Sequence, residues 1–257
     1  MAPVVMPGLG PDRNRQREKM LLETRRLCKS FGSLRAADGI DLGVAAGEAV
    51  GIIGPNGAGK STLFNLIAGN LGADSGEVLL DGLDITRLPA HRRCRAGIGR
   101  SYQIPHPFET LTVFENLLVA AVHGRGRSVK GAADVCAGIL EQTGLIGRAN
   151  AQAGSLTLLE RKRLEMARAL ATTPRLLLLD EIAGGLTESE CHALVATIRD
   201  IRAGGTTIVW IEHIVHALVA VVDRLIVLNF GRKIAEGHPA TVMGSAEVRE
   251  IYMGLAA

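Results

Sequence analysis

One stretch decides the fold of this 257-residue chain: Gly54-Pro55-Asn56-Gly57-Ala58-Gly59-Lys60-Ser61-Thr62. It satisfies the pattern G-x-x-x-x-G-K-[ST], follows the apolar run Ala49 to Ile53 and opens a helix-like segment, Ser61 to Ala68. Glycines in such a loop let backbone N–H groups turn inward around phosphate oxygens, and the helix N-terminus adds the positive end of its dipole. Lys60 is then placed for the β- and γ-phosphates and the Ser61 hydroxyl for Mg²⁺. We call residues 54–62 the phosphate loop.

A second element lies downstream of the phosphate loop. Leu176 to Leu179 is apolar at every position and predicts a strand buried on both faces, which ends in Asp180-Glu181. On its own, this pattern also fits a strand that meets an ordinary turn. Together with the phosphate loop it favours Asp180 as a metal contact, direct or through water, and Glu181 as the base that polarises the attacking water.

Short apolar runs alternate with helix-like segments, which is typical of a parallel sheet with helical crossovers. The clearest strand candidates are Glu48 to Ile53, Arg175 to Asp180, Thr206 to Ile211 and Arg224 to Leu228. Three capping boxes predict helix starts: Thr112 with Glu115, Thr157 with Glu160, and Thr187 with Glu190.

Two segments outside this core, Leu21 to Val44 and Gly76 to Gly82, read as β-rich, and a hairpin is expected around residues 229–232. The stretch from about residue 110 to 170 reads as helical. The predicted fold class is therefore α/β: a P-loop NTPase core with a mainly parallel sheet, an antiparallel β subdomain and an inserted helical subdomain at about residues 104–170.

Composition excludes several classes of protein. Lys and Arg number 29 against 26 Asp and Glu, and aromatic residues make up 3% of the chain, so neither the charge nor the stacking surface of a nucleic-acid binder is present. The most apolar stretch, Thr206 to Phe230, is broken by charged residues and is no membrane span. The basic cluster His91 to Arg95 reads as a solvated helix face.

Residues 1–20 read as a disordered tail rather than a secretory signal, and residues 21–257 as one domain.

The segments around these motifs resemble those of ABC ATPases. Gly97 to Gln103 resembles the Q-loop, Leu156 to Leu170 the signature and its helix, Gly184 to Thr187 the D-loop, and Ile211 to His213 the H-loop. Phe31, followed by a glycine, matches the aromatic residue that stacks on adenine. Taken alone, His213 would also fit a solvated histidine or one with hydrogen-bond partners in the core, and Phe31 would also fit a core aromatic residue in a strand.

The resemblance implies a single ABC ATPase domain that binds ATP and Mg²⁺, with Glu181, His213 and Gln103 as catalytic residues and Ser61, Gln103 and Asp180 at the metal. Nucleotide contacts are implied for Phe31, the phosphate loop and, towards ATP on a second subunit, Thr157, Leu158 and Leu159. The chain most resembles the ATP-binding subunits of branched-chain amino acid importers. That implies a homo- or heterodimer of cassettes at the cytoplasmic face of the membrane, two membrane permease subunits and, indirectly, a solute-binding protein, with no nucleic acid.

The sequence departs from the family at the signature, where Leu-Ser-Gly-Gly-Gln is replaced by Leu156-Thr157-Leu158-Leu159-Glu160. Thr157 keeps a hydroxyl, but the two leucines restrict close approach of the backbone to a phosphate. We expect weaker or slower dimer closure rather than an inactive site. The alternative is an ATP-gated dimerising clamp with little turnover. A soluble ABC ATPase acting on DNA or ribosomes fits less well, because the chain has no long heptads; a GTPase lacks its Asn-Lys-x-Asp motif.

Overall fold

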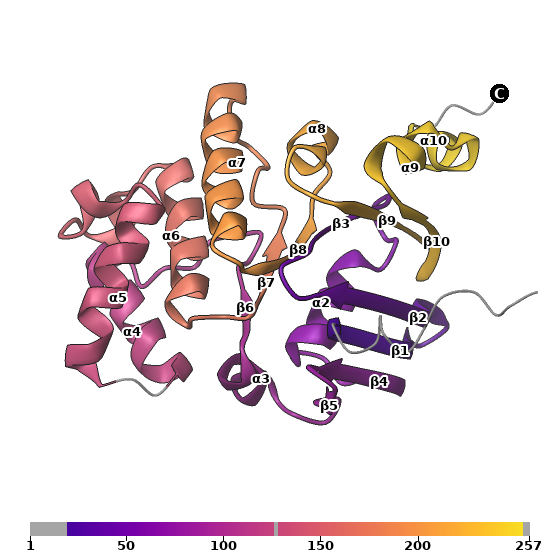
Figure 1. The fold of residues 1–257 in the computed structure, drawn as a ribbon, viewed down its shortest axis with the longest axis horizontal. Helices are drawn as coiled ribbons and strands as arrows, with labels where there is room; N and C mark the ends of the chain where they lie inside the picture. The colour runs from indigo at the N-terminus through magenta and orange to yellow at the C-terminus, as the bar shows by residue number, and fades with distance from the viewer. Residues whose placement is uncertain (1–19, 126–127, 254–257) are drawn as a thin grey trace, which may run out of the picture.

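The computed structural model describes residues 20–125 and 128–253. The expected tail, apart from Met20, and the last four residues of the expected domain lie outside this part of the chain. Two sheets organise the rest (Figure 1): a six-stranded sheet in the order β10-β9-β3-β8-β7-β6 and a four-stranded antiparallel sheet in the order β2-β1-β4-β5. The strands are β1 Met20–Phe31, β2 Leu34–Ala45, β3 Ala49–Ile53, β4 Ser75–Leu80, β5 Leu83–Asp84, β6 Ile98–Arg100, β7 Leu176–Asp180, β8 Thr207–Ile211, β9 Arg224–Asn229 and β10 Arg232–Gly237.

The six-stranded sheet is parallel from β9 to β6, and β10 adds an antiparallel edge. Its central strands are buried on both faces, as the apolar runs predict. In β7, Leu177 and Leu179 enter one hydrophobic cluster, while Leu176 and Leu178 enter the cluster on the other face. The four predicted strands are confirmed to within one residue at either end, since such runs leave no polar side to expose.

Helices cover both faces of this sheet. The helical elements are α2 Lys60–Ala68, α3 Ala90–Ala96, α4 Val113–Arg125, α5 Val129–Gln142, η1 Ile146–Arg148, η2 Ala153–Ser155, α6 Leu158–Ala171, α7 Glu188–Ala203, α8 Val215–Val219, α9 Pro239–Gly244 and α10 Ala246–Met253. Helix α2 packs between the two sheets, and α4 to α8 share the cluster on the opposite face. Helices α4, α5 and α6 gather at one end of the molecule, away from the antiparallel sheet (Figure 1).

The three predicted capping boxes are confirmed. In the boxes that open α6 and α7, the threonine side chain accepts from the glutamate N–H and the glutamate carboxylate accepts from the threonine N–H. Thr112 and Glu115 exchange the same pair of bonds before α4. The predicted hairpin is also confirmed, as Asn229 pairs with Arg232 between β9 and β10.

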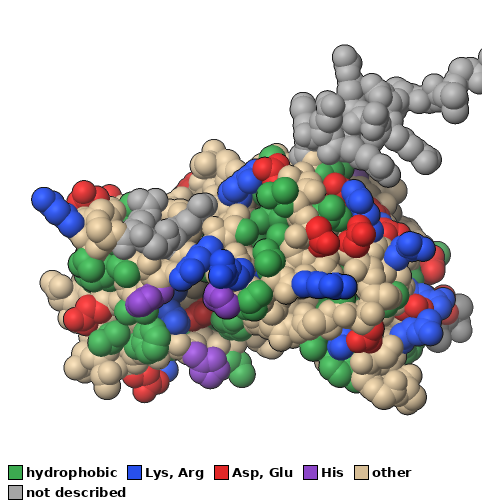
Figure 2. All heavy atoms as spheres, turned by 90° about the horizontal axis from the view of Figure 1, so that it is seen from below, with side chains coloured by type: hydrophobic (Ala, Val, Ile, Leu, Met, Phe, Trp, Pro, Cys, Tyr) green, Lys and Arg blue, Asp and Glu red, His purple; other side chains and the backbone are tan. Residues whose placement is uncertain are grey.

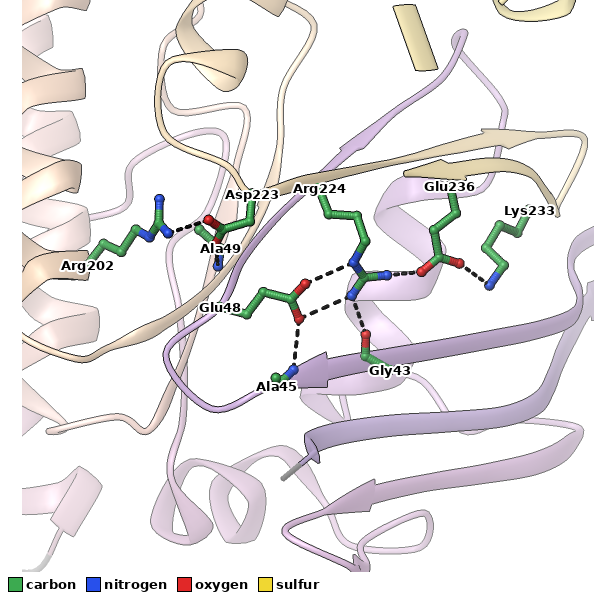
Figure 3. Close-up of polar contacts among 9 residues, drawn as sticks. All are labelled: Gly43, Ala45, Glu48, Ala49, Arg202, Asp223, Arg224, Lys233 and Glu236. Atoms are coloured by element: carbon green, nitrogen blue, oxygen red, sulfur yellow. Dashed lines mark hydrogen bonds and ion pairs between the residues drawn. The ribbon is translucent and has the colours of Figure 1, made fainter. Parts of the chain in front are cut away.

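A polar network joins the two sheets where the end of β2 lies near the start of β9 (Figure 3). Arg224, at the start of β9, contacts the Glu48 carboxylate at 2.9 and 3.2 Å, the Gly43 carbonyl at 2.6 Å and the Glu236 carboxylate. Glu48 also accepts from the N–H of Ala45 at the end of β2. One guanidinium therefore fixes the antiparallel sheet against β9 and β10.

The basic cluster on α3 is exposed as predicted at His91, Arg92 and Arg95, but the prediction is wrong for Arg93. Arg93 is 2% exposed rather than solvated, and its guanidinium donates to four backbone carbonyls. These are Leu66, Ile67, Thr86 and Leu88, at 2.6, 2.9, 2.7 and 2.8 Å. Two of them belong to the last turn of α2, whose carbonyls have no partner within the helix. Arg93 thus caps the helix that begins at the phosphate loop.

Candidate nucleotide-binding site

The phosphate loop connects β3 to α2 at the C-terminal edge of the parallel sheet, where ligands of open α/β sheets bind. It is wedged between β9 and β2. A Cβ on Gly54 would lie 2.2 Å from the Leu228 carbonyl oxygen, and a Cβ on Gly59 would lie 2.1 Å from that of Ala36. Helix α2 starts after Gly59, with no side chain capping its N-terminus. Its first N–H groups are therefore available to an anion.

Lys60 is folded back onto the loop. Its ammonium donates to the carbonyl oxygens of Gly54 at 2.7 Å and Pro55 at 3.0 Å, and the residue is 7% exposed. Burial lowers the pKa of Lys60, while the charges of Glu181 and Asp180 oppose that shift. The lysine is thus held beside both carboxylates, where a phosphate can replace the two carbonyls as its partner.

Asp180 ends β7 and Glu181 follows it, so both lie at the same sheet edge as the phosphate loop. Asp180 is 5% exposed, and burial raises its pKa against the opposing effect of its hydrogen bond to Arg100. Glu181 has a φ of 45°, a left-handed conformation rare for a residue with a side chain, and its N–H donates to the Ile211 carbonyl at 2.9 Å. Such outliers are held by their surroundings and cluster at functional sites.

Two other predicted catalytic residues meet at Glu181. The Gln103 amide Nε2 donates to Glu181 Oε2 at 2.6 Å, and His213 Nδ1 lies 3.8 Å from the same oxygen. The imidazole also lies 3.4 Å from Oε1 of Glu212, which is fully buried and accepts from the backbone N–H groups of Ala183 and His213. The Q-loop, the end of β7 and the H-loop thus converge on one carboxylate.

A cavity of about 440 Å³ connects these groups to the phosphate loop. Its lining residues are Phe31, Leu34, Ala36, Asn56, Gly57, Ala58, Gly59, Lys60, Ser61, Thr62, Gln103 and Glu181. Phe31, at the end of β1, is 50% exposed, and Lys29 Nζ lies 5.9 Å from its ring centre. A half-exposed aromatic ring beside the phosphate loop is suited to stacking on a flat base. Asp180 and His213 adjoin the cavity rather than line it.

The residues expected at Mg²⁺ fit that ion. Ser61, Gln103 and Asp180 offer hydroxyl, amide and carboxylate oxygens, which are the ligand types that Mg²⁺ prefers. No group of three or more His, Cys, Asp or Glu among the described residues could hold a metal by itself. This donor set suits an ion that arrives with phosphate oxygens.

The signature residues lie elsewhere. Thr157 caps α6, Leu158 is 47% exposed, and none of Thr157, Leu158 and Leu159 lines the cavity. The Glu160 carboxylate accepts a hydrogen bond from the backbone N–H of Thr157 and lies 3.2 Å from Arg148 Nε. Within one chain, then, the structure does not bring the signature to the phosphate loop.

Sequence reasoning gave no role to two buried cations that contact the site. Arg100 pairs with Asp180 at 2.9 Å, and Lys162 of α6 donates to the Glu181 carbonyl at 3.3 Å. A signal existed for Arg100, since it ends the strand paired with β7 and so lies near the residue that ends β7. For Lys162 no local signal exists, because its partner is a backbone group 19 residues away.

A family model described as ABC transporter matches residues 37–184, more than half of the chain. This chain belongs to the ABC transporter family. The cassette is 36% identical over 249 residues to the high-affinity branched-chain amino acid transport ATP-binding protein BraF of Pseudomonas aeruginosa, covering 91% of the cassette and 98% of that relative. It is 32% identical over 234 residues to the lipopolysaccharide export system ATP-binding protein LptB of Haemophilus influenzae, covering 91% and 97%.

Solved structures agree with the sequence relatives. A nucleotide-free ATP-binding cassette from an ABC transporter matches this cassette with a TM-score of 0.84 and 33% identity, covering 91% of the cassette and 98% of that chain. The expected family and fold class are therefore confirmed. Membership implies ATP binding, generally with Mg²⁺, ATP hydrolysis, and work as a dimer with membrane permease components. In the part of the cassette that the structure describes, no helix has the length and apolarity to cross a bilayer.

Proposed function

We propose that this cassette binds and hydrolyses Mg-ATP and so drives the import of branched-chain or other amino acids through two separate permease subunits at the cytoplasmic face of the membrane. The observation that carries the catalytic part is the convergence of Gln103 and His213 on Glu181, beside the phosphate loop. The names of relatives such as BraF support the substrate class.

In this proposal the phosphate loop and the open N-terminus of α2 bind the phosphates through backbone N–H groups. Lys60 exchanges the carbonyls of Gly54 and Pro55 for phosphate oxygens, and Phe31 stacks on the adenine. Neutralising the developing phosphate charge is the chemistry that Mg²⁺ supplies when bound. Ser61, Asp180 and Gln103 are the residues that would hold it.

Glu181 acts as the general base. Its carboxylate accepts the proton of the attacking water, while the Gln103 amide keeps that carboxylate in place. His213, beside Glu181, contacts the γ-phosphate. Because Thr157, Leu158 and Leu159 lie away from the cavity of their own chain, they complete the site of a second cassette, a copy of this chain or a paralogue.

Docking of the permease is proposed at the groove between the core and the helical subdomain, residues 104–170. A cavity of about 300 Å³ opens there, lined among others by His91, Arg100, Tyr102 and Arg168. Figure 2, which views the molecule from below, shows histidine, Lys/Arg and hydrophobic side chains close together on part of that face, with Asp and Glu side chains elsewhere on it. Such a mixed surface suits a short amphipathic helix of a membrane subunit.

The segment Ile104 to Phe108 follows closely after Tyr102 of the groove and contacts Arg168, which also lines it. Ile104 is 65% and Phe108 48% exposed, and two prolines restrict the backbone. Arg168 of α6 fixes the segment, since its guanidinium donates to the His106 carbonyl at 2.8 Å and lies 5.2 Å from the Phe108 ring centre. Movement of the docked helix would therefore reach both α6 and Gln103.

The alternative is a clamp that binds ATP and dimerises with little turnover, which the altered signature favours. ATP affinity and phosphate release, measured with the cassette alone and in complex with its permeases, separate the two. Sustained release in the complex supports the proposal. Tight binding with negligible release in both preparations supports the clamp.

Uptake of labelled leucine tests the substrate class in cells that lack the gene. Restoration by the wild-type gene but not by Glu181→Gln is expected. Unchanged leucine, isoleucine and valine uptake in the deletion strain, compared with its parent, would contradict branched-chain amino acid import while leaving the proposed ATP hydrolysis untouched.

A further inference from the structure

The Arg100 guanidinium contacts four side chains, although the proposed function gives it no part in catalysis. One guanidinium nitrogen, Nη2, lies 2.9 Å from Asp180 Oδ2, and the other, Nη1, donates to the side-chain oxygen of Asn65 at 2.7 Å. The guanidinium carbon lies 5.8 Å from the ring centre of Phe64 and 5.0 Å from that of Tyr102. The side chains of Arg100 and Asp180 are 9% and 7% exposed.

The pair solves a problem that burial creates for Asp180. An ionised carboxylate removed from water needs a cation or several donors beside it. Lys60 is committed to the carbonyls of Gly54 and Pro55, so its ammonium donates elsewhere. Within residues 20–125 and 128–253, Arg100 is the residue that donates a hydrogen bond to the Asp180 side chain, while Ser101 accepts one from the Asp180 N–H at 3.4 Å.

The hydrogen bond from the Arg100 guanidinium to Asn65 links the Arg100–Asp180 pair to helix α2. Asn65 lies in the middle of α2, the helix that begins at the phosphate loop. The planar fork of an arginine can hold both oxygens at once, which a lysine ammonium cannot match in geometry. Asp180 is therefore tied through Arg100 to the helix that carries Lys60 and Ser61.

We propose that Arg100 is a positioning residue that holds the Asp180 carboxylate against Asn65 of α2, in the orientation in which Asp180 serves Mg²⁺ on bound nucleotide. The proposal rests on the proposed function, because it takes Mg-ATP as the ligand. Arg100 touches neither nucleotide nor metal in this role and acts through Asp180.

The test compares nucleotide affinity with and without metal. The dissociation constant of a ribose-labelled fluorescent ATP is measured in EDTA and in Mg²⁺. The constant in EDTA divided by the constant in Mg²⁺ reports how much the metal strengthens binding. In Arg100→Gln we expect this ratio to fall by on the order of tenfold, as for other partners of metal ligands, with the constant in EDTA unchanged. Arg100→Lys and Asn65→Ala should lower it by less, because each keeps part of the linkage.

Arg175→Gln is the matched control, since Arg175 makes an exposed ion pair with Asp81 at 2.9 Å, away from the site. An unchanged ratio in Arg100→Gln would overturn the inference. If Arg100→Gln does not fold, as a thermal melt will show, unchanged ratios in Arg100→Lys and Asn65→Ala overturn it instead. If the wild-type cassette binds no labelled ATP, the proposed function and this inference both fail. Unchanged ratios in the variants overturn the inference alone.

Discussion

The side chains of Gln103 and Glu181 meet at 2.6 Å although 78 residues separate them in the chain. The amide is the donor and the carboxylate the acceptor, so the contact orients Glu181 without neutralising it. Gln103 stands between the groove proposed for the permease and the carboxylate proposed as base. A shift of the Q-loop would therefore move the Glu181 carboxylate before it moved the phosphate loop.

Glu181→Gln is expected to lower ATP turnover about 100-fold or more, because an amide cannot accept the proton of the attacking water. ATP binding should persist, and the ATP-bound dimer should accumulate on a sizing column. Glu77→Gln, at an exposed glutamate of β4, is the control and should turn over like the wild type. If turnover survived in Glu181→Gln, another group would have to be the base.

Leu158→Ala tests the altered signature. Leu158 exposes 47% of its surface at the first position of α6, where its bulk would hold a facing phosphate away from the helix N-terminus. In a Glu181→Gln background we expect the ATP-dependent dimer to form at lower protein concentration, as measured by sedimentation. Ile146→Ala, with the same 47% exposure in η1, is the matched control. Equal dimerisation in the two variants would remove the signature as the limiting feature.

Arg93→Met should destabilise the protein by about 3 kcal/mol, because it leaves four buried carbonyls without their donor. The free energy of unfolding in urea measures this loss. Arg92→Met changes the exposed neighbour on the same helix and is expected to have little effect. Similar losses in the two variants would mean that the Arg93 bonds add nothing beyond the general cost of the substitution.

Acid should weaken the capping box of α7. The N–H and hydroxyl of Thr187 both donate to Glu190 at 2.8 Å and lower the pKa of that carboxyl. A depressed folded-state pKa stabilises the fold above the ordinary value, and that contribution is lost as the pH falls through the folded-state value. The difference in unfolding free energy between wild type and Glu190→Gln should therefore shrink from about pH 6 to about pH 3. A constant difference over that range would contradict this assignment.

Local patterns predicted the elements well, and tertiary partners account for what they missed. The apolar runs that became β3, β7 and β8, and the three capping boxes, depend on residues close together in the sequence. Arg93 was predicted to be solvated and Arg100 was given no role, because their partners, the carbonyls ending α2 and the carboxylate ending β7, are far from them in the sequence.

The site shows the same division. Glycine spacing predicted the phosphate loop, and an apolar strand predicted the roles of Asp180 and Glu181, because each motif is local. That Gln103 would bond Glu181 directly, and that Lys162 would donate to its carbonyl, depends on how the sheet and α6 pack. No periodicity encodes such contacts.

The wedging of the phosphate loop has a consequence for synthesis. Gly54 rests against the carbonyl of Leu228, and the N–H of Gly231 donates to the Ala58 carbonyl at 3.0 Å. The loop leaves the ribosome well before the strand that supports it, because β9 lies far downstream in the chain. The phosphate loop therefore lacks these two contacts until β9 and the turn after it have left the ribosome, so its final shape depends on a segment far downstream.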